Sequence, residues 1–131
     1  MGFGFALCYM GLLYFGAMIA PGVGLSGHLM VQMPSTLLEW SHAPGYGLLA
    51  WLLTCGLRRR SWPFAYALPV ASAAALVFGL WTEIFQGTVP GRNTSTDDLV
   101  TDAIGIGLVA ALMVSRRLCD HISFSLRVSQ Y

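Results

Sequence analysis

The first 38 residues contain no Asp, Glu, Lys or Arg, and a second stretch of 22 residues, 61–82, also lacks them. A soluble fold of this size needs charged and polar side chains over most of its surface. Only 10% of the 131 residues are charged, whereas 56% are hydrophobic. Because soluble domains average about 25% charged residues, this composition argues against a soluble enzyme, a disordered chain or a nucleic-acid binder. It indicates an integral membrane protein.

A helix needs roughly 20 apolar residues to cross a hydrocarbon core of about 30 Å, which limits this chain to four crossings with their loops. We therefore expect an all-α fold, an integral membrane four-helix bundle that forms a single membrane domain over residues 1–131. The predicted segments are four crossings and a tail that lies on the membrane surface: 3–20, 40–57, 65–84, 98–115 and 118–131.

The predicted boundaries follow from breaks in the apolar pattern. Pro21 and Gly22 disfavour continuation of the first helix. A signal peptide carries Lys or Arg near its start, and none precedes this helix, so we expect the helix to be retained. Residues 22–38 are uncharged but interrupted by Gly, Ser and Pro. This pattern favours a segment at the membrane interface, although a crossing stays open as an alternative. Arg116 and Arg117 are predicted to end the last crossing.

The arginines predict the orientation of the bundle. Six of the seven follow the second or the fourth predicted crossing, and only Arg92 lies in a loop on the other side. Positively charged loops stay in the cytoplasm. We therefore expect both termini to be cytoplasmic and Arg92 to face outward.

Polar side chains gather at the predicted outer ends of three crossings and in the outer loop. His42 and Tyr46 are spaced i, i+4, and Glu83 and Gln86 are spaced i, i+3, so each pair shares one helix face. Charges in hydrocarbon cost about 2.5–3.5 kcal/mol each on insertion scales, which marks such residues as candidates for function. The complete candidate set is His42, Tyr46, Glu83, Gln86, Arg92, Ser95, Asp98 and Asp102. We expect it to form one site in which Arg92 pairs with Glu83 or Asp98.

A purely structural interpretation of the same residues is open. Asp97 and Asp98 stand where the last helix begins, a position at which the helix dipole favours carboxylates. Ser95 or Thr96 is the expected N-cap of that helix. Asp102 fits this interpretation least, because it lies a full turn inside the predicted crossing.

Residues 83–105 carry a series of fixed polar, Pro and Gly positions: Glu83-x-x-Gln86, Pro90-Gly91-Arg92-x-x-Ser95-x-x-Asp98 and then Gly105. This series resembles the signature of the VanZ-like membrane proteins, and His42-x-x-x-Tyr46 matches that family's other recurring element. The resemblance covers about residues 37–115. It implies a small multi-pass protein of the bacterial cytoplasmic (inner) membrane, with four helices and no settled reaction. One departure is Asp102, where family members often carry Asn.

Two functions remain open on the sequence. In the first, the outward-facing polar site binds an anionic envelope molecule, such as a lipid-linked phosphate or a cell-wall precursor. Arg92 would hold the anion, because a guanidinium matches phosphate or carboxylate bidentately. In the second, the chain is a small accessory subunit of a larger membrane complex, and the polar cluster only locks the bundle. Membrane lipids are expected partners in either case, and nucleic acid is not.

The sequence does not favour an enzyme, because it contains no nucleophile elbow, phosphate-binding loop or HExxH motif. If a reaction occurs, His42 and Glu83 are the acid–base candidates. Cys8, Cys55 and Cys119 form no CxxC pair, which supports neither a disulfide framework nor a zinc site. No metal or cofactor is expected.

Overall fold

The computed structural model describes residues 2–92 and 94–128. This part of the chain is all-α, as predicted, and contains no strand. Its five helices are α1 (Gly2–Ala17), α2 (Gly24–Gln32), α3 (Ser35–Arg58), α4 (Phe64–Gln86) and α5 (Thr96–Val128).

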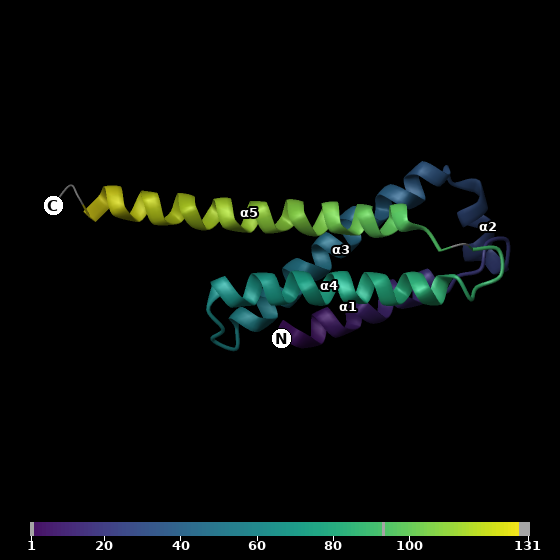
Figure 1. Ribbon diagram of the computed structural model, residues 1–131, viewed down its shortest axis with the longest axis horizontal. Helices are drawn as coiled ribbons and strands as arrows, with labels where there is room; N and C mark the ends of the chain where they lie inside the picture. The colour runs from purple at the N-terminus through teal and green to yellow at the C-terminus, as the bar shows by residue number, and fades with distance from the viewer. Residues whose placement is uncertain (1, 93, 129–131) are drawn as a thin grey trace.

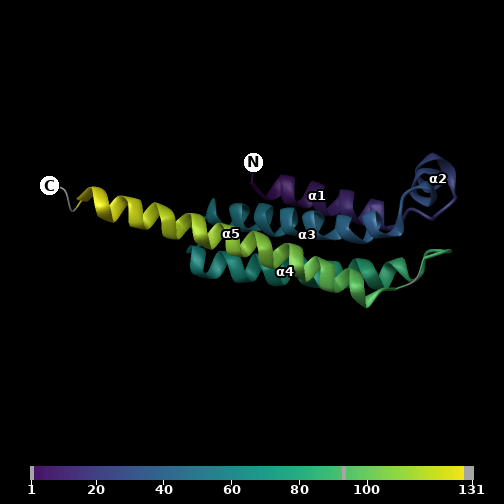
Figure 2. The ribbon, with the colours of Figure 1, turned by 90° about the horizontal axis from the view of Figure 1, so that it is seen from above.

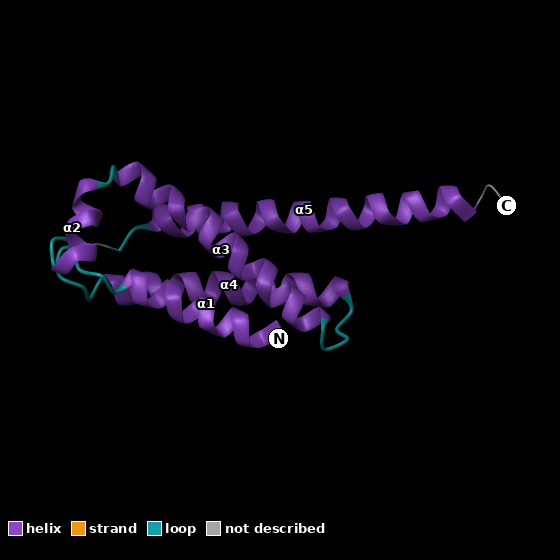
Figure 3. Cartoon of the chain, turned by 180° about the vertical axis from the view of Figure 1, so that it is seen from behind, coloured by secondary structure: helices purple, strands orange, loops and turns teal. Residues whose placement is uncertain are grey.

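The four long helices run side by side, and α3 contacts α1, α4 and α5 (Figure 1). Seen from above, α1 and α3 lie on one side of the bundle and α4 on the other, and α5 crosses obliquely over α3 and α4, both of which it contacts (Figure 2). The short α2 and the connection from α4 to α5 lie together at one end, and the turn from α3 to α4 lies at the opposite end (Figure 3). The end that carries α2 is also where the sequence predicts the polar cluster.

Glycines allow α3 and α5 to approach each other closely. A Cβ atom on Gly105 of α5 would collide with the backbone of Ala43, and a Cβ on Gly47 of α3 would lie 2.8 Å from the carbonyl oxygen of Gly105. Small residues at such crossings let helix backbones pack directly against each other. This crossing brings the outer half of α3, including His42, next to the start of α5.

The core of the bundle consists largely of small side chains, whereas many large apolar side chains face outward. Ala67, Ala71 and Ala75, spaced four residues apart on α4, are almost completely buried. In contrast, Phe15 is 74% exposed and Val77 is 67% exposed. Two helical segments, Phe64–Gln86 and Thr96–Leu118, are long and apolar enough to cross a membrane.

Several helix ends differ from the prediction. The helix that contains the last predicted crossing continues past Arg116 and Arg117 to Val128, although its segment apolar enough to cross a membrane ends at Leu118. Arginine ends an apolar segment but is a good helix former, so the helix itself goes on. The first helix ends at Ala17 rather than at residue 20, since the chain already turns ahead of Pro21. The helix α3, which contains the second predicted crossing, begins at Ser35 rather than at residue 40.

Residues 22–34 form no long helix, and residues 35–38 are the first turn of α3. The helix α2 has nine residues, which corresponds to about 14 Å of axial rise and is too short to cross a hydrocarbon core. Gly22 and Gly24, with φ of 76° and 66°, form the bend that precedes it. Such positive φ values are readily available to glycine alone.

Candidate functional site

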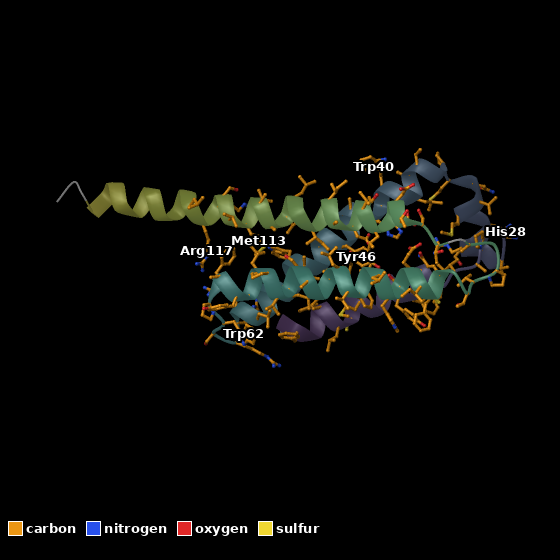
Figure 4. All side chains as sticks on the ribbon, in the orientation of Figure 1. His28, Trp40, Tyr46, Trp62, Met113 and Arg117 are labelled. Carbon is orange, nitrogen blue, oxygen red and sulfur yellow. The ribbon has the colours of Figure 1, made fainter. Side chains whose placement is uncertain are left out.

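The predicted polar residues come together at the end of the bundle that carries α2. A cavity of about 570 Å³ lies there between α1, α2, α3 and the α4–α5 connection. Five of the eight predicted residues line it, namely His42, Tyr46, Gln86, Arg92 and Asp98. The other three, Glu83, Ser95 and Asp102, are hydrogen-bonded to cavity residues or to their neighbours in the same network. Figure 4 shows Tyr46 between α4 and α5, on the α2 side of Met113.

His42 and Asp102 form a buried pair between α3 and α5. The Nδ1–H group of His42 donates to Asp102 Oδ1 at 3.1 Å. Asp102 is only 2% exposed, and a Cβ on Gly79 of α4 would lie 2.5 Å from its other oxygen. The missing side chain at Gly79 therefore makes room for this carboxylate where three helices meet.

The Nε2 atom of His42 is free of such contacts. It makes no hydrogen bond to any described residue, and it is not among the fully buried unpartnered atoms of that part of the chain. His42 also lines the cavity. Its ring therefore uses one nitrogen to hold Asp102 and leaves the other accessible.

Tyr46 holds α3 against α4 through a short chain of hydroxyl hydrogen bonds. Thr82 Oγ1 donates to the carbonyl oxygen of Gly79 at 2.8 Å. Since its only hydrogen is used there, the Tyr46 hydroxyl donates to Thr82 Oγ1, at 2.5 Å. The Tyr46 ring also stacks on His42, with ring centroids 5.9 Å apart. This stacking, together with Asp102, fixes the orientation of the imidazole.

Glu83 ties the loop after α4 to the end of that helix. One of its carboxylate oxygens, Oε1, accepts the backbone N–H of Ser95. When the amide of Gln86 is oriented to satisfy both its neighbours, its nitrogen donates to Glu83 Oε2 at 2.8 Å. Ser95 Oγ in turn accepts the backbone N–H of Asp97 at 3.2 Å, which confirms Ser95 as the N-cap of α5.

A tight turn directs Arg92 back toward the bundle. Pro90 and Gly91 occupy its central positions, Gly91 has φ of 81°, and the Arg92 N–H donates to the carbonyl oxygen of Val89 at 3.1 Å. This sequence and this geometry are those of a type II turn. The turn places the guanidinium on the wall of the cavity.

The Arg92 guanidinium binds neutral oxygens. Its Nη1 donates to the carbonyl oxygen of Ala17, the last residue of α1, at 2.7 Å, and to the side-chain oxygen of Gln86 at 2.8 Å. Its Nη2 lies 3.9 Å from the sulfur of Met30. Within the described part of the chain, the one salt bridge joins His42 to Asp102. The predicted ion pair of Arg92 with Glu83 or Asp98 is therefore wrong, because Gln86 stands between Arg92 and Glu83.

Burial lowers the pKa of the Arg92 guanidinium, and the nearby negative charges of Asp98 and Glu83 oppose that change. Arginine starts from so high a pKa that it stays charged in proteins. The cavity wall therefore carries a permanent, half-buried positive charge.

Asp98 is the one predicted residue that makes no side-chain hydrogen bond to the described residues. Its Oδ1 atom is fully buried without a partner. The residue lies in the first turn of α5, where the helix dipole favours its negative charge. Asp98 also lines the cavity.

Sequence reasoning missed two polar contacts and the apolar wall of the cavity. Thr82 lies one turn before Gln86 on α4, so the helical period was a usable signal for it. The carbonyl of Ala17 carries no side-chain signal, although carbonyl groups at helix C-termini need outside donors. The apolar part of the wall comes from α1, α2 and α3: Leu12, Leu13, Met30, Val31 and Leu38.

No group of three or more His, Cys, Asp or Glu residues in the described part of the chain could hold a metal ion. Comparisons of the sequence and the structure with family models, curated proteins and solved structures find no match.

Proposed function

We propose that this chain is a VanZ-like integral membrane protein whose polar site binds the anionic head of an amphipathic envelope molecule. In this proposal α1, α3, α4 and α5 cross a bacterial cytoplasmic membrane, with both termini in the cytoplasm. The outward-facing apolar side chains support the membrane location, because soluble proteins rarely expose contiguous patches of this kind. The positions of the arginines support the orientation.

The arginine-rich turn and the polar site lie at opposite ends of the bundle, which agrees with this orientation. Trp62 and Arg117 lie at one end of the bundle and His28 at the other (Figure 4). Arg58 ends α3, and the turn that follows it, with Arg59 and Arg60, lies at the Trp62 end. The proposed binding site is thus at the end that lacks the arginine-rich turn.

The state of Arg92 is the observation that carries the binding proposal. Its guanidinium is charged, half-buried and on the wall of a cavity, and no described carboxylate lies within 4.0 Å of it. A buried charge without an opposite charge costs free energy. An anionic group bound in the cavity offsets that cost, because hydrogen bonds between ions are about twice as strong as neutral ones.

The apolar side of the cavity supports an amphipathic ligand. Leu12, Leu13 and Val31 line the same cavity as Arg92, so one molecule can place an anionic head on Arg92 and an acyl or prenyl chain along α1 and α2. A small, fully polar anion would make no apolar contact with these side chains.

Substitution of Arg92 tests the proposal. We expect Arg92→Gln to weaken binding of dioleoyl phosphatidic acid to the purified protein by about 10-fold or more, as for loss of a hydrogen bond to a charged group. Native mass spectrometry of the detergent-solubilised protein would measure the affinity. Arg116→Gln is the matched control, because Arg116 is exposed and distant from the cavity.

The structural alternative predicts a different result. If the cluster only locks the bundle, Arg92→Gln lowers the melting temperature, while the folded fraction binds phosphatidic acid as tightly as the Arg116→Gln control does. That result would contradict the binding proposal.

A further inference from the structure

Two opposite charges face the cavity without meeting each other. Arg92 and Asp98 both line it, yet no Arg92 nitrogen lies within 4.0 Å of an Asp98 oxygen. Charges in a partly buried site normally pair or bind other groups, because an isolated one is costly. Here each retains unused hydrogen-bonding capacity.

That capacity can be assigned to particular atoms. Both hydrogens of Arg92 Nη1 are used by Ala17 and Gln86. Among the described residues, Nη2 has only the 3.9 Å contact with the Met30 sulfur and Nε has no partner. Asp98 Oδ1 is fully buried without a donor, whereas Asp98 Oδ2 also has no described donor but is not fully buried. The protein thus presents the Arg92 donors and the Asp98 Oδ2 acceptor to one cavity.

Arg92 and Asp98 are positioned by different parts of the chain. Arg92 is held by the end of α1 and by Gln86 on α4. Asp98 belongs to the first turn of α5, which Ser95 caps. The two hydrogen bonds of 2.7 and 2.8 Å hold the Nη1 end of Arg92 against α1 and α4, and no Arg92 nitrogen lies within 4.0 Å of an Asp98 oxygen.

A ligand that satisfies both groups must carry an anionic oxygen and, a short distance away, a positively charged N–H donor. The apolar wall adds a requirement for hydrocarbon chains. We propose that the cavity binds a zwitterionic phospholipid head that has a phosphate and a primary ammonium group. The phosphate lies on Arg92 and the ammonium on Asp98. This inference rests on the proposed function and narrows its ligand class.

A series of lipids tests this on the unmodified protein. We expect dioleoyl phosphatidylethanolamine to bind about 10-fold more tightly than dioleoyl phosphatidylglycerol, which has a phosphate but no ammonium. Dioleoyl phosphatidylcholine, whose quaternary ammonium group is positively charged but has no N–H donor, should also bind more weakly. Glycerophosphoethanolamine, which has the same head without chains, should not compete; if it does, the ligand is a free headgroup rather than a lipid. Equal affinities for the three lipids would overturn the inference.

Substitution of Asp98 assigns the preference to that residue. Asp98→Asn should abolish the preference for phosphatidylethanolamine while affinity for phosphatidylglycerol stays within about 2-fold. Asp97→Asn is the matched control, since Asp97 is the exposed neighbour in the same helical turn, and it should keep the preference. If both variants keep it, Asp98 does not bind the ammonium.

The results separate this inference from the proposed function. If Arg92→Gln weakens all three lipids equally and Asp98→Asn has no effect, anion binding holds and the zwitterionic ligand is wrong. If Arg92→Gln weakens none of them, the proposed function itself is wrong.

Discussion

The contact between α3 and α5 predicts that alanine has opposite effects at two glycines of the same helix. A Cβ atom on Gly105 would lie 2.5 Å from the carbonyl carbon of Ala43 and 2.6 Å from its Cα. Nonbonded carbon atoms prefer separations of about 3.5–4.0 Å, so the two helices would have to separate by about 1 Å. At Gly107 a Cβ would meet no atom within 4 Å.

The expected magnitudes follow from these distances. Overpacking in a filled interior costs about 1–3 kcal/mol, and we expect the upper part of that range for Gly105→Ala because the collision is with rigid backbone. Replacing glycine by alanine in an open helical position gains about 0.5–1 kcal/mol. The free energies of unfolding of Gly105→Ala and Gly107→Ala should therefore differ by roughly 3 kcal/mol.

Denaturant titration of both variants in the same detergent, followed by tryptophan fluorescence, measures this difference directly. Because both substitutions add one methyl group to α5, they change its helix propensity and hydrophobicity equally. Equal stabilities, or a less stable Gly107→Ala variant, would refute the close crossing of α3 and α5.

Three further predictions concern the site itself. Tyr46→Phe should lower the free energy of unfolding by about 1 kcal/mol through loss of one hydrogen bond, whereas Tyr66→Phe, at an exposed position, should leave it unchanged in the same titration. Asp102→Ala should cost about 1–3 kcal/mol because it leaves the Nδ1–H of His42 without an acceptor; Asp102→Asn, which keeps an acceptor, should cost less, and equal costs would argue against that hydrogen bond. Gly91→Ala should destabilise the outer loop by about 1 kcal/mol, since alanine at positive φ is strained, and faster limited proteolysis after Val89 would reveal it.

The sequence was sufficient to predict that the fold is all-α and roughly where the long helices lie. Apolar stretches separated by Pro, Gly and Arg define these helices with little ambiguity, and α4 differs from its predicted range by three residues in total. The predicted helix ends were less accurate where side-chain polarity was the only signal. Arg116 and Arg117 end a stretch of apolar surface, but they are good helix formers, so α5 continues past them.

The sequence predicted that the site residues lie at the same depth along the bundle, and helical spacing was sufficient for that prediction. The partners of those residues depend on helix rotation and on the α4–α5 loop, neither of which is encoded in the spacing. Arg92 was expected to pair with Glu83 or Asp98, yet a backbone N–H and the Gln86 amide occupy the two oxygens of Glu83. Charge alone suggested an ion pair between Glu83 and Arg92, whereas the loop geometry gives Glu83 two neutral hydrogen-bond donors.

This difference bears directly on function. An Arg92 that paired with Glu83 would be neutralised within the protein and would have little left to offer a ligand. Because Gln86 separates the two side chains, the positive charge is anchored by neutral oxygens and faces a cavity that also contains the unpartnered carboxylate of Asp98. A locking role would be served better by a closed ion pair than by this open arrangement, and the separation of Arg92 from Asp98 is therefore the best reason to look for a bound molecule here.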